Sequence, residues 1–257
     1  MKRIIVVLIL FFIFAGWQSV TAGDDPDSPT PTIEPEKGQL VLPARSMKSG
    51  KRRVSYHPKT GKVRFLSGGK GHSIQQPSAL PKDASPEMAA RTFLSEYGSM
   101  FGIADQGREL KVRREMSSSR GRTGVRFQQV FQDIPVFGGE LIVQMDGAKN
   151  VLSANGEVLP KIRVDTKPTI DSSQAKKTAK QAVAKFYKTV ELSQLKASQP
   201  ELWLYNPVLI GPGENETSLV WRVEVTTVNL GTIHELVLVN AHDGFVDLHF
   251  NTVPLSR

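Results

Sequence analysis

His234 and Glu235 stand next to each other near the end of the chain, and this dipeptide opens the zinc-binding pattern H-E-x-x-H. In that pattern two histidines one helical turn apart hold the metal, and the glutamate acts as a general base. Here the fifth position is Leu238, and the surrounding residues alternate as in a β-strand. Positions four apart on a strand lie too far from each other to share one metal ion. We therefore predict no zinc site and no peptidase chemistry at this dipeptide.

The other residues that could do chemistry also lack a catalytic arrangement. There is no cysteine, which excludes disulfides and thiolate catalysis. No serine stands in a G-x-S-x-G nucleophile elbow. We predict a protein without catalytic residues, metal ligands or a bound cofactor. The histidines, which show no ligand spacing, are His57, His72, His234, His242 and His249.

The first residues have the three parts of a signal peptide. Lys2 and Arg3 form a basic start, residues 4–15 are apolar, and Ala22 closes a small-residue cleavage site. The apolar run is shorter than the ~20 residues of a membrane-spanning helix. We predict that residues 1–22 are removed and that the mature chain is extracellular or periplasmic. An uncleaved anchor remains the alternative.

The positive charge is concentrated in one stretch. Residues 45–70 contain nine basic residues and no acidic one, which exceeds the net charge of +8 for the whole chain. Such a stretch favours an anionic cell-surface polymer or an acidic protein, or it is a solvated hairpin without a specific partner. We expect no nucleic acid as partner of a secreted chain. The basic residues are Arg45, Lys48, Lys51, Arg52, Arg53, Lys59, Lys62, Arg64 and Lys70.

Composition and periodicity divide the mature chain into three parts. Residues 23–45 are acidic and proline-rich, which predicts a linker without a core. Residues 46–165 form the first folded unit. It begins with a hairpin over residues 53–65 and has a helix that starts at Ser85-Pro86-Glu87. Residues 166–257 form the second unit.

Residues 124–159 are the centre of the first unit and predict three consecutive strands. Period-two alternation places Val125, Phe127 and Phe131 on one face of the first strand. Arg126, Gln128 and Gln132 are predicted on its opposite face.

The second unit has a helix followed by strands. Asp171 and Gln174 have capping-box spacing, and the helix is predicted to reach about residue 190. Strands are expected over residues 201–205, 218–226, 233–240 and 245–251. The predicted fold class is therefore α+β, with two small units that each pack a helix on an antiparallel sheet. The apolar face of the second helix is predicted to be Ala175, Ala179, Ala182, Val183 and Phe186.

The central stretch closely resembles the FTP (fungalysin/thermolysin propeptide) domain, whose pattern is approximately hRFxQxxxGxPVxGxxxxV. Arg126-Phe127, Gln129, Pro135-Val136 and Gly138 match it, while Asp133 or Ile134 replaces the glycine before the Pro-Val pair. The helix AARTFLSEYGSMFGI also looks like the one that begins FTP domains, and the second unit is similar to a PepSY-like propeptide half. The resemblance covers residues 50–252 and implies two cystatin-like halves.

The resemblance implies a propeptide of a thermolysin-type zinc metalloprotease without the catalytic domain. We expect a secreted, non-catalytic protein that acts in trans on such a protease as folding chaperone, inhibitor or both. Two alternatives remain open. One is an envelope- or cell-surface-binding module, and the other is the pro-region of a split or truncated protease gene.

The residues expected to bind the partner fall into three groups. Arg126 and Gln128 alternate with core residues and so point away from the apolar interior. The Pro-Val turn follows them, and the tail is expected to approach the partner's cleft, as the resemblance implies. The residues of the turn and tail are Pro135, Val136, Phe137, Gly138, Thr252, Val253, Pro254 and Leu255.

Overall fold

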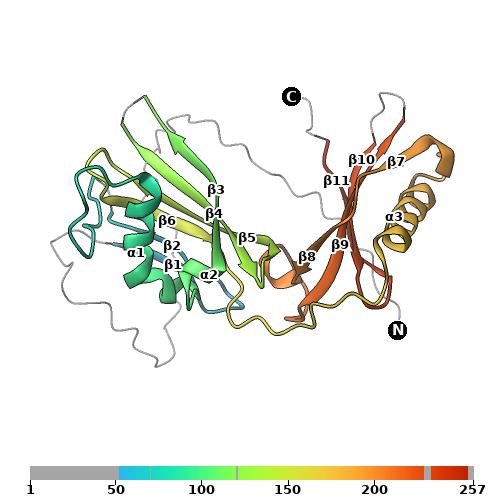
Figure 1. Ribbon diagram of the computed structural model, residues 1–257, viewed down its shortest axis with the longest axis horizontal. Coiled ribbons are helices and arrows are strands. Elements are labelled where there is room, and N and C mark those ends of the chain that lie inside the picture. Colours follow the sequence, from blue (N-terminus) through green and yellow to red (C-terminus); the bar gives the residue numbers. More distant parts are fainter. Residues whose placement is uncertain (1–51, 70, 120, 229–232, 254–257) are drawn as a thin grey trace, which may run out of the picture.

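The computed structural model describes residues 52–69, 71–119, 121–228 and 233–253. The predicted signal peptide, the predicted linker, Pro254 and Leu255 lie outside these ranges. Within them the chain forms two lobes side by side, with α1 and α3 at opposite outer ends (Figure 1). In the described residues we find no helix with the length and apolarity that crossing a membrane requires.

The N-terminal lobe is a curved antiparallel sheet with the order β1-β2-β6-β5-β4-β3. Helix α1 lies across one face of it. The N-cap of this helix is Ser85, whose hydroxyl accepts from the Met88 N–H at 3.1 Å, and Gly102 ends the helix with φ 97°. The elements are β1 (Arg53–Tyr56), β2 (Val63–Ser67), α1 (Pro86–Phe101), α2 (Gln106–Glu109), β3 (Leu110–Ser117), β4 (Thr123–Phe131), β5 (Ile134–Met145) and β6 (Val151–Glu157).

The core of this lobe lies between α1 and the sheet. Phe93 and Tyr97, one turn apart on α1, stack at 4.6 Å between ring centroids. They belong to one buried cluster with Phe127 of β4 and Leu141 of β5. The predicted alternation of β4 is thus confirmed at Val125 and Phe127, which are fully buried.

The C-terminal lobe places α3 on one face of a second set of strands, ordered β8-β9-β10-β11 with β7 beside β9. The side chain of Asp171 caps α3 by accepting from the Gln174 N–H at 2.8 Å, as the sequence predicted. The elements are α3 (Ser172–Tyr187), the 3-10 helix η2 (Leu192–Gln194), β7 (Leu195–Ala197), β8 (Glu201–Tyr205), the 3-10 helix η3 (Pro207–Leu209), β9 (Ser218–Thr227), β10 (His234–Asn240) and β11 (Val246–Asn251).

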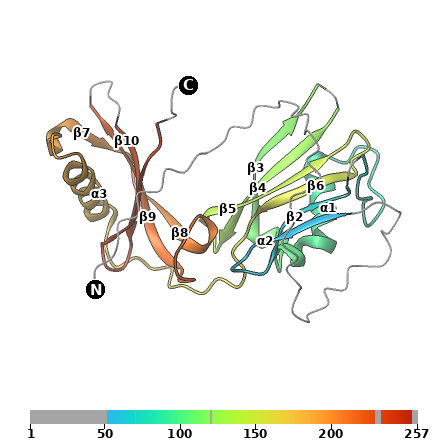
Figure 2. The same cartoon turned by 180° about the vertical axis from the view of Figure 1, so that it is seen from behind.

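The mixed α+β class is confirmed, but the two sheets are not separate. Val136 of β5 pairs in parallel with Leu204 of β8, so the described strands make one curled sheet of eleven strands. Helices α1 and α3 cover the outer sides of their lobes, and both sheets turn a face without a long helix toward the middle of the molecule (Figures 1 and 2).

Three local predictions were wrong. Phe131 does not join the Phe127 face, because a bulge between Gln128 and Val130 shifts the register and buries Val130 instead. Phe186 is exposed on α3, beyond the reach of the core that buries Ala175, Ala179 and Val183. Helix α3 also ends three residues early, because Lys188 adopts a left-handed φ of 58° and its N–H bonds the Ala184 carbonyl.

Candidate protein-binding surface

Arg126 lies on the helix-free face of the N-terminal sheet, where the sequence placed it. Its guanidinium is 3.4 Å from a carboxylate oxygen of Glu140, and Glu140 also binds Arg113 of β3. Both arginines remain partly exposed. Two positive charges around one carboxylate leave this part of the face net positive, which suits an acidic partner group.

Gln128 lies beside Arg126 but its side-chain amide is used within the chain. Its Nε2 donates to the carbonyls of Val136 at 2.7 Å and Gly139 at 2.9 Å. These bonds hold the start of β5 against β4. Gln128 therefore positions the Pro-Val segment, and its NH₂ group is already satisfied.

Gln129 matches the motif, but the sequence did not predict its structural role. It occupies the bulge of β4, is 1% exposed, and its amide makes two bonds to the backbone of Leu159, at 2.8 and 2.9 Å. A buried amide satisfied on both sides fixes the segment that leaves the first lobe. A glutamine at position 129, between the apolar residues Phe127 and Phe131 in the predicted alternation, was the sequence feature that could have indicated a buried, hydrogen-bonded amide.

The turn of the β4–β5 hairpin has Asp133 where the motif has a glycine. Gln132 and Asp133 form its two-residue turn with φ of 49° and 66°. Two consecutive positive φ values are those of a type I′ turn. Asp tolerates the left-handed region better than most residues, so Asp133 takes the place of the glycine. Lys111 of β3 binds its carboxylate at 2.8 Å.

The segment with Pro135, Val136, Phe137 and Gly138 lies at the seam between the lobes. Val136 is fully buried, and the Phe137 ring lies between 6.1 and 6.4 Å from the rings of Trp203, Tyr205 and Phe250. Gly138 has φ 77°, and a Cβ there would lie 2.6 Å from Cγ2 of Ile210. Its lack of a side chain is required by the close approach of the second lobe.

The predicted basic hairpin makes a second contact across the seam. Nδ1 of His57 accepts from the backbone N–H groups of Lys59 and Thr60, so the proton is on Nε2, which donates to the Val208 carbonyl at 3.1 Å. Lys59 Nζ donates to the Gly213 carbonyl at 2.6 Å. The tip of the hairpin therefore binds the loop that follows β8.

The base of the same hairpin is also paired. Arg64 binds Glu157 of β6 at 2.7 Å. Burial raises the pKa of the Glu157 carboxyl, although Arg64 and His57 act against it. Arg64 and Lys59 thus have protein partners, which reduces the charge that this stretch can offer to an external polymer.

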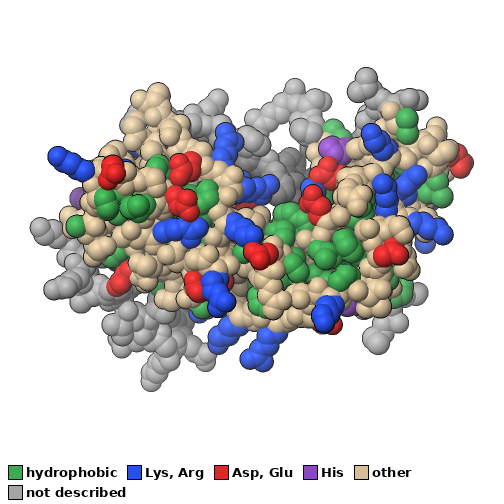
Figure 3. All heavy atoms as spheres, in the orientation of Figure 1, with side chains coloured by type: hydrophobic (Ala, Val, Ile, Leu, Met, Phe, Trp, Pro, Cys, Tyr) green, Lys and Arg blue, Asp and Glu red, His purple; other side chains and the backbone are tan. Residues whose placement is uncertain are grey.

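The helix-free face of the C-terminal sheet is apolar at its centre. Figure 3 shows hydrophobic side chains gathered in the middle of the molecule, with acidic side chains and a histidine along the upper margin. Burial, together with Asp247, raises the pKa of Tyr205 to about 12, so this hydroxyl stays neutral. The buried members of this face are Tyr205, Val220, Leu236, Leu238, Leu248 and Phe250.

A charged group borders that apolar centre. Arg222 binds Glu224 and lies 3.9 Å from Glu201, and its guanidinium is 5.7 Å from the Trp203 ring. Burial would raise the pKa of Glu224, but Arg222 and His234 outweigh it and hold the pKa below its ordinary value. The Glu224 carboxylate is therefore ionised at neutral pH.

The dipeptide His234-Glu235 belongs to a strand, as predicted, and its two side chains point to opposite faces. Glu235 is 2% exposed and accepts bonds from Tyr187 of α3 and, at 2.8 Å, from Asn251. His249 Nε2 lies 2.8 Å from its other oxygen. Burial opposes ionisation, yet His249, Tyr187 and Asn251 together hold the pKa of Glu235 below its ordinary value. The glutamate is a structural anchor of β11.

The start of the predicted tail is attached to β10. Thr252 donates its N–H at 2.7 Å and its hydroxyl at 2.9 Å to the His234 carbonyl. The N–H of Val253 bonds the Asn251 side chain at 2.8 Å, and the Val253 side chain is exposed. Pro254 and Leu255 lie outside the described residues.

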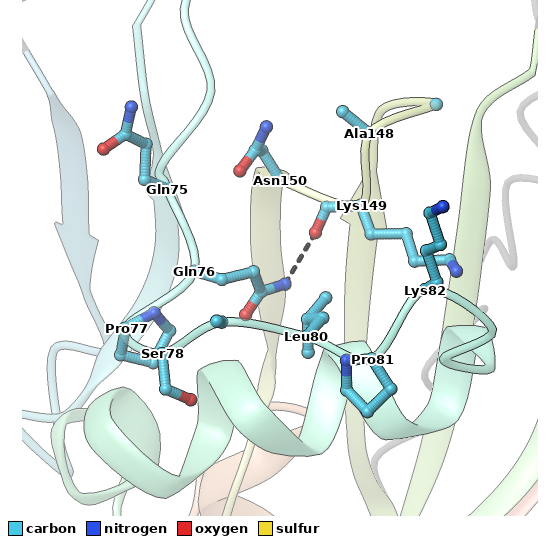
Figure 4. Close-up of a pocket in the computed structure, with 12 residues that line it drawn as sticks. Gln75, Gln76, Pro77, Ser78, Leu80, Pro81, Lys82, Ala148, Lys149 and Asn150 are labelled. Carbon is cyan, nitrogen blue, oxygen red and sulfur yellow. Dashed lines mark hydrogen bonds between the residues drawn. The ribbon is translucent and has the colours of Figure 1, made fainter.

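The described residues were also searched for metal sites and for cavities that could bind a small molecule. No cluster of three or more His, Cys, Asp or Glu residues suited to a metal occurs in residues 52–69, 71–119, 121–228 and 233–253. A cavity of about 580 Å³ lies between the loop before α1 and the β5–β6 turn, with Gln76 Nε2 donating to the Lys149 carbonyl at 2.6 Å (Figure 4). Its lining consists of loop residues without an acid–base pair, so it suggests no chemistry.

The fold and these surfaces describe a two-lobed α+β protein whose lobes are joined by the pairing of β5 with β8. Residues 108–158, from α2 to β6, match the family described as Fungalysin/Thermolysin Propeptide Motif. The chain is distantly homologous to thermolysin of Alicyclobacillus acidocaldarius subsp. acidocaldarius and of Bacillus caldolyticus. Each is 25% identical over 173 residues, which is 66% of this chain and 30% of the relative. The match therefore spans less than a third of those proteins.

Proposed function

We propose that this chain is a secreted, non-catalytic protein that binds a thermolysin-type metalloprotease in trans, as folding chaperone, inhibitor or both. One observation carries the proposal. The propeptide motif contains β5, the strand that pairs with β8 and joins the lobes, and both sheets turn a helix-free face toward the middle of the molecule (Figure 1). The two lobes correspond in this proposal to cystatin-like halves, the second PepSY-like.

The seam supports binding because it fixes the surface before the partner arrives. Phe137, His57 and Lys59 each cross from the first lobe to the second. A preformed surface loses little conformational entropy on association. It can lower the barrier for a partner whose sheets must pair over long sequence separations, and tight binding to the folded partner then denies substrate its site.

The proposal is tested with mature thermolysin of Bacillus caldolyticus. We expect the purified chain to inhibit hydrolysis of a peptide substrate and to raise the yield when denatured thermolysin is refolded. A chain ending at Asn251 should keep refolding activity but inhibit less if the tail enters the cleft. Arg126→Ala should weaken binding if that charge contacts the partner. Absence of both inhibition and assisted refolding by the intact chain would refute the proposal.

The cell-surface alternative rests on the basic stretch, and the structure supports it less. Lys59 and Arg64 of that stretch are bound to the chain itself. Retention on anionic cell-wall polymer that is lost at raised ionic strength, together with no effect on thermolysin, would favour this alternative.

A further inference from the structure

The edge strands of the curled sheet are not equally protected against pairing with another chain. An exposed edge offers unpaired backbone groups, and proteins protect such edges with charges or by keeping the strand short. Edge strand β3 carries Lys111, Arg113 and Arg114, all exposed. Edge strands β1 and β7 have only four and three residues. These three edges therefore resist strand addition.

Strand β11 is the exception among the described edge strands. It has six residues and pairs on one side only, with β10. It contains no lysine, arginine or proline. Its Asp247 bonds Asn240 at 3.1 Å and its His249 is turned toward Glu235, so neither side chain shields the outer backbone edge.

Exposed apolar side chains lie at both ends of this edge, whereas Leu248 and Phe250 in its middle are buried. Val246 at its start is 37% exposed, and Val253, just beyond its end, is 39% exposed. Phe245 precedes the strand and is also exposed. Phe186 of α3 is exposed as well and lies edge-on to His249, with 5.3 Å between the rings. Apolar contacts on both sides of a free backbone edge are the features that recognise an extended peptide.

We propose that β11 binds an extended strand of the partner protein by β-augmentation. The occupant is defined by chemistry: a segment with an unpaired backbone edge and apolar side chains at alternate positions. Six residues span roughly 20 Å, and about half of them direct N–H and C=O outward, which allows about six backbone hydrogen bonds. A helix could not satisfy these groups, because its own backbone bonds are internal.

The inference rests on the proposed function, since it takes the strand from the thermolysin-type protease. The position of β11 directly before the tail supports the protease as the source of the added strand. β11 runs directly into Thr252 and Val253, the residues assigned to the approach to the partner's cleft. A strand paired along β11 would therefore lie at the same end of the molecule and would align the tail.

The test uses thermolysin of Bacillus caldolyticus made inactive by replacing its general-base glutamate with glutamine. Val246→Lys and Val253→Lys place a charge beside the edge, and we expect each to weaken binding at least tenfold. Met88→Lys and Leu192→Lys are matched controls, because those side chains are 46% and 43% exposed and lie away from β11. The controls should bind within about twofold of the unchanged chain. Hydrogen exchange of β11 amides should slow in the complex.

The outcomes separate the two proposals. If the unchanged chain binds thermolysin but β11 exchanges equally fast in the complex and both lysine variants bind normally, the strand inference is wrong and the proposed function stands. If the unchanged chain does not bind at all, the proposed function fails and the inference falls with it. If β11 is protected without thermolysin and sedimentation shows a dimer that Val246→Lys abolishes, the occupant is a second copy, which also overturns the inference.

Discussion

At the residue scale, Glu235 shows how packing decides the role of a side chain. The same dipeptide in a helix, followed by a second histidine, would suggest a zinc protease. In β10 its carboxylate is buried against α3 and β11, with donors from Tyr187, His249 and Asn251 around it. A buried charge is tolerated when such partners satisfy it. The cluster holds the last strand in place.

Glu235→Gln should change how stability depends on pH. The folded-state pKa lies below the ordinary value of 4.5. The ionised carboxylate therefore stabilises the fold above about pH 4.5, and this contribution is lost as the pH falls through the lower folded-state value. The variant should be destabilised at pH 7 by about 1–3 kcal/mol, because the neutral amide no longer offers the surrounding donors a charged acceptor.

The destabilisation caused by Glu235→Gln should shrink below pH 4, and chemical denaturation at a series of pH values measures it. Glu96→Gln, on the exposed side of α1, is the control and should leave the curve unchanged. A destabilisation of Glu235→Gln that is the same at pH 3 and pH 7 would contradict ionisation as its cause.

Gly138→Ala should destabilise the seam by about 1–3 kcal/mol, because the new methyl overlaps Ile210 in addition to straining a left-handed backbone. Gly61→Ala measures backbone strain alone, since Gly61 has φ 64° and no atom within 4 Å of the added Cβ. Combining Gly138→Ala with Ile210→Ala should recover part of the loss relative to the Ile210→Ala chain. Equal effects of the two glycine changes would rule out the steric contact.

At the element scale, α3 ends through a residue poorly suited to the position. Lys188 adopts φ 58° at the helix C-terminus, where glycine is preferred. The left-handed conformation costs about 1 kcal/mol or more for a residue with a Cβ. The sequence predicted too long a helix α3, because lysine, unlike glycine, does not usually mark the left-handed residue that ends a helix.

Lys188→Gly should therefore stabilise the C-terminal lobe by about 0.5–1 kcal/mol, because the strain is removed while the capping bond to Ala184 is kept. Thermal unfolding followed by circular dichroism measures the shift. Lys185→Gly, one position within the last turn, is the opposite control and should destabilise by about 1 kcal/mol. If both changes destabilise, the left-handed cap is not what limits the helix.

At the scale of the whole molecule, the two lobes share a buried cluster in which Val136 of β5 packs with Leu204 of β8 and Leu219 of β9. The backbone contributes one parallel strand pair, Val136 with Leu204, and the side chains contribute the ring cluster around Phe137. His57 and Val208, 151 positions apart, add a hydrogen bond. The angle between the helix-free faces, and with it the proposed binding surface, depends on these contacts.

Phe137→Ala should loosen the lobes from each other without unfolding either one. Each lobe keeps its own core, so calorimetry should show the single transition broaden or split into two, with a loss of about 2–4 kcal/mol from the contact between lobes. Inhibition of thermolysin should fall at the same time. Phe245→Ala, which removes an exposed ring, is the control for thermal behaviour. One unchanged, sharp transition in Phe137→Ala would contradict coupling through this ring.

The amino-acid pattern was sufficient for most individual elements. The strand Glu201–Tyr205, the N-caps Ser85 and Asp171, and the burial of Phe127 depend on neighbours close in sequence or on period-two alternation. Hydrogen bonds within a turn and the facing of alternate side chains are local effects, so local sequence predicts them. The motif in β4 and β5 likewise indicated the distant relation to thermolysin before any contact was known.

Contacts between distant segments decided the rest. Sequence alternation could not show that Gln128 would be used within the chain, or that Phe137 would pack on Trp203 and Phe250. It also could not show that Glu235 would meet Tyr187, 48 positions away. Such pairs form only when the lobes and sheets assemble, because their energy comes from burial and mutual satisfaction of groups that are far apart along the chain. The seam, the buried carboxylate and the open edge of β11 are therefore properties of the assembled fold.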